Sequence, residues 1–194
     1  MNICVARDEA FNFTYRANLD SLARLGQVSF FSPLRDSHLP ACSLLYLPGG
    51  YPELYAQQLA ANDSMRCSIR DFALSNGHVY AECGGFMYLC QEIDGQPMCG
   101  VFPLRATMQD ARLHLGYRQM EWQGRRLRGH EFHYSRVCPS TLPADVTALV
   151  LQQTASGQPV DTPLYLFHHV IAGYTHWYWA EGDVPFPFFP DLLM

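Results

Sequence analysis

Lysine is absent from this chain of 194 residues, so all 13 of its Lys and Arg side chains are arginines. A phosphate-binding loop depends on a lysine that reaches the phosphates of the nucleotide, and the sequence therefore excludes that loop. We expect the chain to bind no cofactor. Any chemistry that requires ATP and Mg²⁺ must then come from another polypeptide or domain.

Long runs of like charge and long apolar runs are also missing. The formal net charge is −5 without a run of like charges, which gives no support for nucleic acid or a membrane as a partner. Residues 1–5 lack the pattern of a signal peptide, and no apolar run approaches membrane-spanning length. Seven cysteines form no C-x-x-C pair, and an odd number suits a reduced chain. We expect a cytoplasmic protein.

The composition is that of a folded protein, with 48% hydrophobic and 16% charged residues. The length suits one domain with a full core, so we predict a single domain over residues 1–194. Its end, about 183–194, is rich in Pro and Phe and cannot form a helix or a central strand. We expect this tail to lie over an apolar groove, with a disordered end as the alternative.

Hydrophobic periodicity predicts an α/β fold. Helical patterns cover residues 14–25, 52–59 and 64–74, the last with Asp63 or Ser64 as its cap. Strand patterns cover residues 2–6, 28–31, 43–47 and 78–82. This alternation favours a mostly parallel sheet with helices on both faces. The second half is strand-rich, with strands expected at 98–108, 115–122, 127–134, 146–151, 164–168 and 171–179.

Cys83 stands at the most informative turn of the sequence. The apolar strand 78–82 runs into Cys83 and then at once into two glycines and a helix-like segment. Such a sharp strand-to-helix turn lifts a nucleophile clear of the sheet, and Ala81 and Gly85 are small enough to let strand and helix approach. The glycine pair Gly49 and Gly50 ends another strand, and its N–H groups could receive an oxyanion. The two segments together predict a thiol acyl-transfer site.

A thiol nucleophile requires a base, and five histidines are candidates. His176 lies near the end of the last strand pattern, 171–179, and strand ends of a parallel sheet gather on the edge where Cys83 lies. The alternatives are His130, His133, His168 and His169. A metal site built from these four is disfavoured, because His-Glu-Phe-His is one residue short of the zinc-protease spacing and lies in a strand pattern. We therefore expect no metal.

Six segments carry a resemblance to a known family. They are residues 6–13 (ARDEAFNF), 31–34 (FSPL), 47–54 (LPGGYPEL), 80–89 (YAECGGFMYL), 129–135 (GHEFHYS) and 173–176 (GYTH). In this order they closely resemble the C-terminal glutaminase domain of the cobyrinic and hydrogenobyrinic acid a,c-diamide synthases. The resemblance implies a flavodoxin-like class I glutamine amidotransferase fold. Ammonia from glutamine would pass to an ATP-dependent synthetase domain that amidates corrinoid carboxylates, and that domain is absent from this chain.

The resemblance also implies roles for individual residues. Cys83 and His176 would be catalytic, and Gly50 and Gly84 would supply N–H groups to the oxyanion. Substrate binding would involve Gly49, Arg112 and His133. Arg112 is the type of residue that clamps a carboxylate, although a solvated surface charge is the simpler reading of it.

One departure from the wider class concerns the base. Many class I glutaminases carry a glutamate two residues after the catalytic histidine, and this chain has Tyr178 there. The resemblance therefore implies a Cys–His dyad without a carboxylate beside the ring. Three other classes stay open: a related cysteine-elbow hydrolase, a binding-only remnant, and a regulatory subunit.

Overall fold

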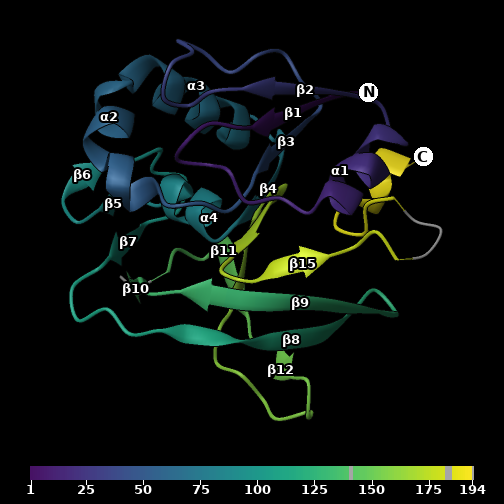
Figure 1. Ribbon diagram of the computed structural model, residues 1–194. Coiled ribbons are helices and arrows are strands. Elements are labelled where there is room, and N and C mark those ends of the chain that lie inside the picture. The colour runs from purple at the N-terminus through teal and green to yellow at the C-terminus, as the bar shows by residue number, and fades with distance from the viewer. Residues whose placement is uncertain (140–141, 182–184, 194) are drawn as a thin grey trace.

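A seven-stranded sheet runs through the molecule (Figure 1) in the order β11-β13-β14-β4-β3-β1-β2. The computed structural model describes residues 1–139, 142–181 and 185–193. Five neighbouring strands are parallel: β1 (Asn2–Ala6), β2 (Gln27–Phe31), β3 (Leu44–Leu47), β4 (His78–Glu82) and β14 (Val170–Gly173). Two antiparallel strands, β13 (Leu164–Phe167) and β11 (Val146–Leu149), extend one edge. The predicted α/β fold with a mostly parallel sheet is confirmed.

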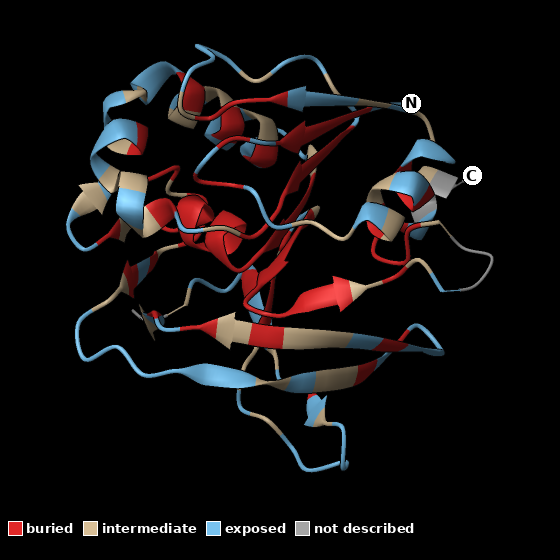
Figure 2. Cartoon of the chain, viewed as in Figure 1, coloured by how far each residue is buried: buried red, intermediate tan, exposed pale blue. Residues whose placement is uncertain are grey.

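Strands β3 and β4 are buried on both faces (Figure 2), which explains their unbroken apolar runs. Side chains alternate across the sheet, so Leu45 and Leu47 enter one core cluster while Leu44 and Tyr46 enter the other. The first cluster lies between the sheet and the helices α3 (Asp63–Leu74) and α4 (Gly84–Leu89). Asn62 caps α3 by accepting a hydrogen bond from the Met65 N–H, so the predicted caps Asp63 and Ser64 are wrong by one or two residues.

The opposite face of the sheet is covered by a helix and by strands of the second half of the chain. Helix α1 (Arg16–Ala23) covers part of it, and a small sheet in the order β12-β8-β9-β15 covers the rest. Its strands are β8 (His114–Trp122), β9 (Arg125–His133), β12 (Gln153–Thr154) and β15 (His176–Tyr178). Helices therefore lie on both faces of the sheet, as predicted, and strands of the strand-rich second half complete this layer.

A third sheet, in the order β10-β7-β5-β6, follows the Cys83 region in the chain. It consists of β5 (Glu92–Ile93), β6 (Gln96–Pro97), β7 (Leu104–Thr107) and β10 (Arg136–Pro139). The segment predicted as the helix 52–59 forms a 3₁₀ turn, η1 (Pro52–Tyr55), and the short helix α2 (Ala56–Ala61). No helix in the described ranges is long and apolar enough to cross a bilayer.

The predicted strand 171–179 is divided in two. Strand β14 lies in the large sheet beside β4, whereas β15 pairs with β9 in the small sheet. The chain changes sheets at Tyr174 and Thr175, both buried, so an apolar run continuous in sequence serves two sheets.

The described part of the tail lies over an apolar face, as predicted. Phe186, Phe188 and Phe189 are buried in the cluster beneath α1 and the small sheet, and η2 (Pro190–Leu193) follows them. Residues 183, 184 and 194 of the predicted tail lie outside the described residues.

Candidate active site

Cys83 occupies a strained turn between β4 and α4. Its backbone angles are φ 47° and ψ −106°, a region that side chains other than glycine rarely adopt. The turn is fixed on both sides, since the Cys83 N–H donates to the Gly173 carbonyl and its own carbonyl accepts from the Met87 N–H. The expected sharp strand-to-helix turn is present, and the cysteine is 6% exposed.

Two glycine pairs allow this turn to form. A Cβ on Gly85 would lie 2.1 Å from the Leu47 carbonyl oxygen, so only glycine lets α4 approach β3 this closely. A Cβ on Gly84 would lie 3.1 Å from the Gly50 nitrogen, which places the glycine pair after β3 beside the start of α4. Because Gly84 is the first residue of α4, its N–H has no partner within the helix.

His176 lies beside Cys83, at the start of β15, just after the chain passes from the large sheet to the small sheet. Strand β14 runs parallel to β4 and ends at Gly173, opposite Glu82, so the next residues arrive at the Cys83 edge. The ring is 3% exposed and packs over Gly49, where an added Cβ would lie 2.2 Å from the ring Cε1. It stacks on His130 at a centroid distance of 4.9 Å and meets the edge of Phe13 at 4.6 Å.

A carboxylate lies beside the His176 ring, contrary to the expected dyad. Glu82 Oε2 is 3.7 Å from His176 Nδ1, and Glu82 is the residue that precedes Cys83. Burial alone would lower the pKa of His176, but interactions with the Cys83 thiol and the Glu82 carboxylate outweigh it and raise that pKa to about 10. The sequence assigned Glu82 no role in the site, because the pattern of the wider class places the carboxylate two residues after the histidine.

A cavity of about 280 Å³ opens onto the cysteine and the imidazole. It is lined by Asn12, Phe13, Gly50, Tyr51, Cys83, His130, Phe132 and His176. The volume is that of a small ligand, and the Cys83 thiol donates a weak hydrogen bond to the Phe132 carbonyl at 3.8 Å. Asn12, Phe13, Tyr51 and Phe132 belong to the family-like segments, but no pattern in the sequence distinguishes them as lining residues.

His130 shares the cavity and is the histidine nearest to His176. The two residues are paired in register between β9 and β15. The Tyr15 hydroxyl lies 2.5 Å from His130 Nδ1. Burial and the charge of His176 lower the pKa of His130, which favours its neutral form beside a charged His176.

His133 and Arg112 lie outside the cavity. The His133 ring faces away from His130, as expected for positions three apart on a strand, and both of its nitrogens have partners at 2.7 Å, Ser135 O and Glu131 Oε1. Arg112 is exposed on the segment before β8, and its backbone N–H donates to the Tyr134 carbonyl. Neither side chain is brought to Cys83.

His168 and His169 are removed from the reaction site. They form the turn between β13 and β14, where the His169 carbonyl accepts from the Val79 N–H and its ring contacts His78. This is the opposite end of β4 from Glu82, about 13 Å away at the rise of a strand. The structure therefore leaves His176 and His130 as the imidazoles beside Cys83.

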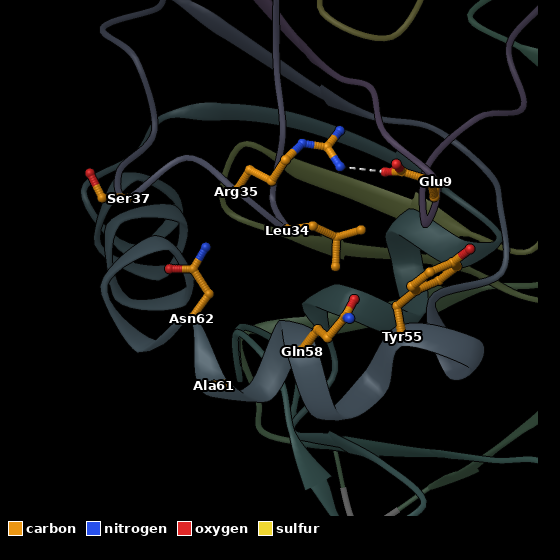
Figure 3. A pocket seen from close by; sticks show the side chains of 8 residues that line it. All are labelled: Glu9, Leu34, Arg35, Ser37, Tyr55, Gln58, Ala61 and Asn62. Atoms are coloured by element: carbon orange, nitrogen blue, oxygen red, sulfur yellow. Dashed lines mark hydrogen bonds and ion pairs between the residues drawn. The ribbon is translucent and has the colours of Figure 1, made fainter.

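A larger hollow of about 690 Å³ lies elsewhere, between the loops after β1 and β2 and helix α2 (Figure 3). Its charged groups are paired with each other, Arg35 with Glu9 at 2.7 Å. Asn62 is occupied by the carbonyls of Pro33 and Asp36. The residues that face this hollow include no cysteine or histidine, and it carries no chemistry of the kind found at Cys83.

One group of side chains has the spacing of a metal site. His114, Glu131 and His133 offer ligand atoms within 4.8 Å of one another. The Glu131 carboxylate is bound by Arg118 at 2.7 Å and by His133 at 2.7 Å. A cation there would compete with a guanidinium for the same carboxylate, so the donor set fits an ion-pair network better than a metal.

Comparison with known proteins agrees with the geometry. Residues 2–184 match the family described as the CobB/CobQ-like glutamine amidotransferase domain. The chain is 44% identical over 146 residues to a cobyrinate a,c-diamide synthase of Methanothermobacter thermautotrophicus, covering 71% of this chain and 33% of that protein. It is 39% identical over 184 residues to a hydrogenobyrinate a,c-diamide synthase of Pseudomonas aeruginosa, covering 92% of this chain and 41% of that protein. The chain thus spans less than half the length of these relatives.

A solved structure shares the fold. A glutamine amidotransferase from Thermotoga maritima superposes with a TM-score of 0.58 at 13% identity, covering 90% of this chain and 75% of that one. At this identity the likeness speaks for the fold alone, whereas the family match extends over nearly all of the sequence that forms the site. The chain belongs to the family of CobB/CobQ-like glutamine amidotransferase domains.

Proposed function

We propose that this chain is the glutaminase part of an a,c-diamide synthase of cobyrinic or hydrogenobyrinic acid. It hydrolyses glutamine at Cys83 and delivers ammonia to an ATP-dependent synthetase part that lies outside this sequence. The observation that carries the proposal is the thiol of Cys83, held in a strained turn and facing a cavity of about 280 Å³ that the His176 ring also lines.

The reaction proceeds through a thioester. The Cys83 thiol gives its proton to His176 as its sulfur forms a bond to the side-chain amide carbon of glutamine. The carbonyl electron pair moves onto the oxygen, where the Gly50 and Gly84 N–H groups stabilise it. The C–N bond then breaks as His176 donates a proton to the departing ammonia. A water molecule that His176 deprotonates attacks the thioester and releases glutamate and the free thiol.

Gly49, Arg112 and His133 are assigned to substrate binding. Gly49 leaves room for the imidazole beside the ligand. Arg112 would clamp the α-carboxylate of glutamine with paired hydrogen bonds, which requires its exposed side chain to turn toward the cavity. His133 faces away from the cavity with both ring nitrogens bonded, so it would contribute by holding β9 next to the cavity residue Phe132 and not by direct contact with glutamine.

An apolar rim around the cavity supports a docked synthetase part. Leu115 and Tyr117 of β8 pair in register with Phe132 and His130, so they share the face that opens on the cavity. Both are more than 60% exposed, and Tyr51 at the cavity is 45% exposed. Exposed apolar groups gathered around a site are typical of a surface that binds a partner. ATP and Mg²⁺ would be bound by that partner.

The test is mass spectrometry of the chain after treatment with a chloroketone analogue of glutamine. We expect one adduct, on Cys83, whose formation excess glutamine prevents. The variant Cys83→Ser should lose both the adduct and glutamine hydrolysis, whereas Cys67→Ser, which removes an exposed thiol on α3, should keep both.

Other outcomes identify the competing classes. Hydrolysis that persists in purified Cys83→Ser overturns the mechanism. Absence of an adduct in the unaltered chain indicates a binding-only remnant or a regulatory subunit. An adduct that glutamine does not suppress indicates a cysteine hydrolase with another substrate.

A further inference from the structure

Glu82 is a buried carboxylate with an unusual set of partners. It is 1% exposed and accepts three hydrogen bonds, from the Tyr46 hydroxyl at 2.9 Å, the Tyr80 hydroxyl at 2.7 Å and the Trp177 N–H at 2.9 Å. Within the described ranges no arginine forms an ion pair with it. Burying a charge without a cation is costly, so these donors and a fourth group must stabilise it.

The fourth group is the His176 imidazole. Its Nδ1 is buried without a hydrogen-bond partner, and Glu82 Oε2 lies 3.7 Å away. The distance is longer than a hydrogen bond, but side chains of unliganded active sites often tighten when the substrate binds. His176 Nδ1 and Glu82 Oε2 therefore face each other, and a small rotation of the imidazole ring would bring them within hydrogen-bond distance.

The backbone fixes this arrangement. Trp177 follows His176 directly, so the hydrogen bond from the Trp177 N–H ties β15 to the carboxylate next to the ring. The two phenols come from the neighbouring strands β3 and β4, and they are held in their protonated, donating form because burial and the charge of Glu82 raise the pKa of each far above its usual value. The carboxylate is thereby aimed at the ring from β4 itself.

We propose that Glu82 is the positioning residue of this site: it orients the His176 ring, keeps Nδ1 protonated, and leaves Nε2 to exchange protons with Cys83. The assignment of the reacting nitrogen rests on the proposed function. The third member of the machinery then comes from the strand that carries the nucleophile, one residue before it, and the position two residues after the histidine is free to be Tyr178.

The charges around the ring fit this role. From β4 and its turn the ring faces Glu82 and Cys83, from β9 it faces His130, and from the loop after β1 it faces the uncharged Phe13. Glu82 is the carboxylate that forms an ion pair with the ring among the described residues. Its removal should therefore favour the neutral imidazole, with His130 acting in the same direction.

The first experiment is an NMR titration of the His176 ring in the full chain. In Glu82→Gln, which keeps the size of the side chain, the midpoint of His176 should fall by about one pH unit or more. The matched control Glu121→Gln, on exposed β8, should leave the midpoint unchanged. An unchanged midpoint in Glu82→Gln overturns the proposal.

A second experiment separates positioning from a structural role. In Glu82→Gln we expect kcat for glutamine hydrolysis to fall about 100-fold or more, with KM within about threefold, because the carboxylate acts on the base and not on the ligand. A purely structural role would lower stability and leave the His176 midpoint in place. Equal kcat in the variant and the unaltered chain overturns the proposal.

A third measurement needs no variant at Glu82. In the unaltered chain at high pH, ¹⁵N shifts of the neutral His176 ring should report a proton on Nδ1, whereas a proton on Nε2 overturns the proposal. This readout is independent of catalysis. If the glutamine analogue fails to modify Cys83 while the titration and the tautomer agree with Glu82, the proposed function fails and the pairing of Glu82 with His176 stands.

Discussion

At the scale of single residues, the site depends on glycines that leave space as much as on the reactive side chains. The His176 ring fills the space above Gly49, and the nucleophile stands in a turn that only a few residue types tolerate. The sequence pattern predicted the turn correctly, because strand, cysteine and paired glycines are adjacent in the chain. Placing an imidazole over Gly49 requires tertiary contacts between residues more than 120 positions apart, which no local pattern encodes.

Gly49→Ala tests this packing. The added Cβ would lie 2.2 Å from His176 Cε1, so the ring must move. Because proton transfer depends on the position of the ring, we expect kcat for glutamine hydrolysis to fall about 100-fold with a preserved circular dichroism spectrum. Hydrolysis at the unaltered rate would mean that the ring position is not critical for turnover.

Glu82 shows the limit of residue-level prediction from sequence. A glutamate inside an apolar strand, with no basic residue nearby in the chain, is the signal that could have drawn attention to it. The pattern of the wider class places a carboxylate on the strand of the histidine, whereas the structure places it on β4. The pairing of β14 with β4 brings the residues that follow β14, including His176, to the edge of the sheet where Glu82 lies.

At the scale of elements, the parallel strands were predicted well and the second half less so. β1, β3 and β4 are short apolar runs bounded by turns, and burial on both faces makes them recognisable. The run 171–179 was predicted as one strand because its burial is continuous, and the change of sheet at Tyr174 has no local signature. Partner choice between strands is a property of the whole fold.

The hairpin of β8 and β9 contains a buried ion-pair network that can be tested separately. Glu131 is fully buried and binds Arg118, His133 and the Thr162 hydroxyl at 2.7 to 3.0 Å. Burial would raise the pKa of Glu131, but the bonds to His133 and Arg118 outweigh it and lower that pKa to about 2. The network lies on one face of β9, and the cavity residues His130 and Phe132 lie on the other face.

Glu131→Gln should lower the free energy of unfolding by about 3 kcal/mol at neutral pH, since it leaves a buried guanidinium without its counter-charge. A carboxyl whose pKa is lowered on folding stabilises the fold above its ordinary value of 4.5 and loses that contribution as the pH falls toward 2. Urea unfolding at several pH values should therefore show a steep acid loss in the unaltered chain and a flatter one in the variant.

The control for this series is Glu121→Gln, an exposed carboxyl on β8. It should change the unfolding free energy by less than about 0.5 kcal/mol at neutral pH. Equal stability of Glu131→Gln and Glu121→Gln would contradict a structural role for the network.

At the scale of the whole molecule, the two faces of the large sheet are covered by different elements. One face is closed by α3 and α4, and the other by α1, the small sheet and the tail (Figure 1). The tail matters because its aromatic side chains lie beneath the Glu82 network. Phe188 stacks on Tyr80 at a centroid distance of 4.3 Å, and Tyr80 is a hydrogen-bond donor to Glu82.

Sequence composition predicted that this tail covers an apolar groove, because its prolines exclude regular structure while its phenylalanines demand burial. It could not predict which groove. The tail is fastened by main-chain carbonyls, Pro185 O accepting from the Ser21 hydroxyl and Pro187 O from the Trp122 ring N–H. These contacts tie residues 185–187 to both α1 and β8, two elements about 100 residues apart in sequence. The tail therefore links the two parts of the layer that covers this face of the sheet.

Phe188→Ala tests the tail as part of the core. Phe188 is 2% exposed and contacts Tyr80, Trp122 and Phe186, so its truncation should lower the free energy of unfolding by about 3 to 5 kcal/mol in urea titrations. Phe30→Ala is the matched control, because Phe30 is 46% exposed and should cost about 1 kcal/mol or less. Since Phe188 supports Tyr80, its truncation should also slow alkylation of Cys83 by the glutamine analogue in the folded protein. A Phe188→Ala variant as stable as Phe30→Ala would mean that the tail is dispensable to the fold.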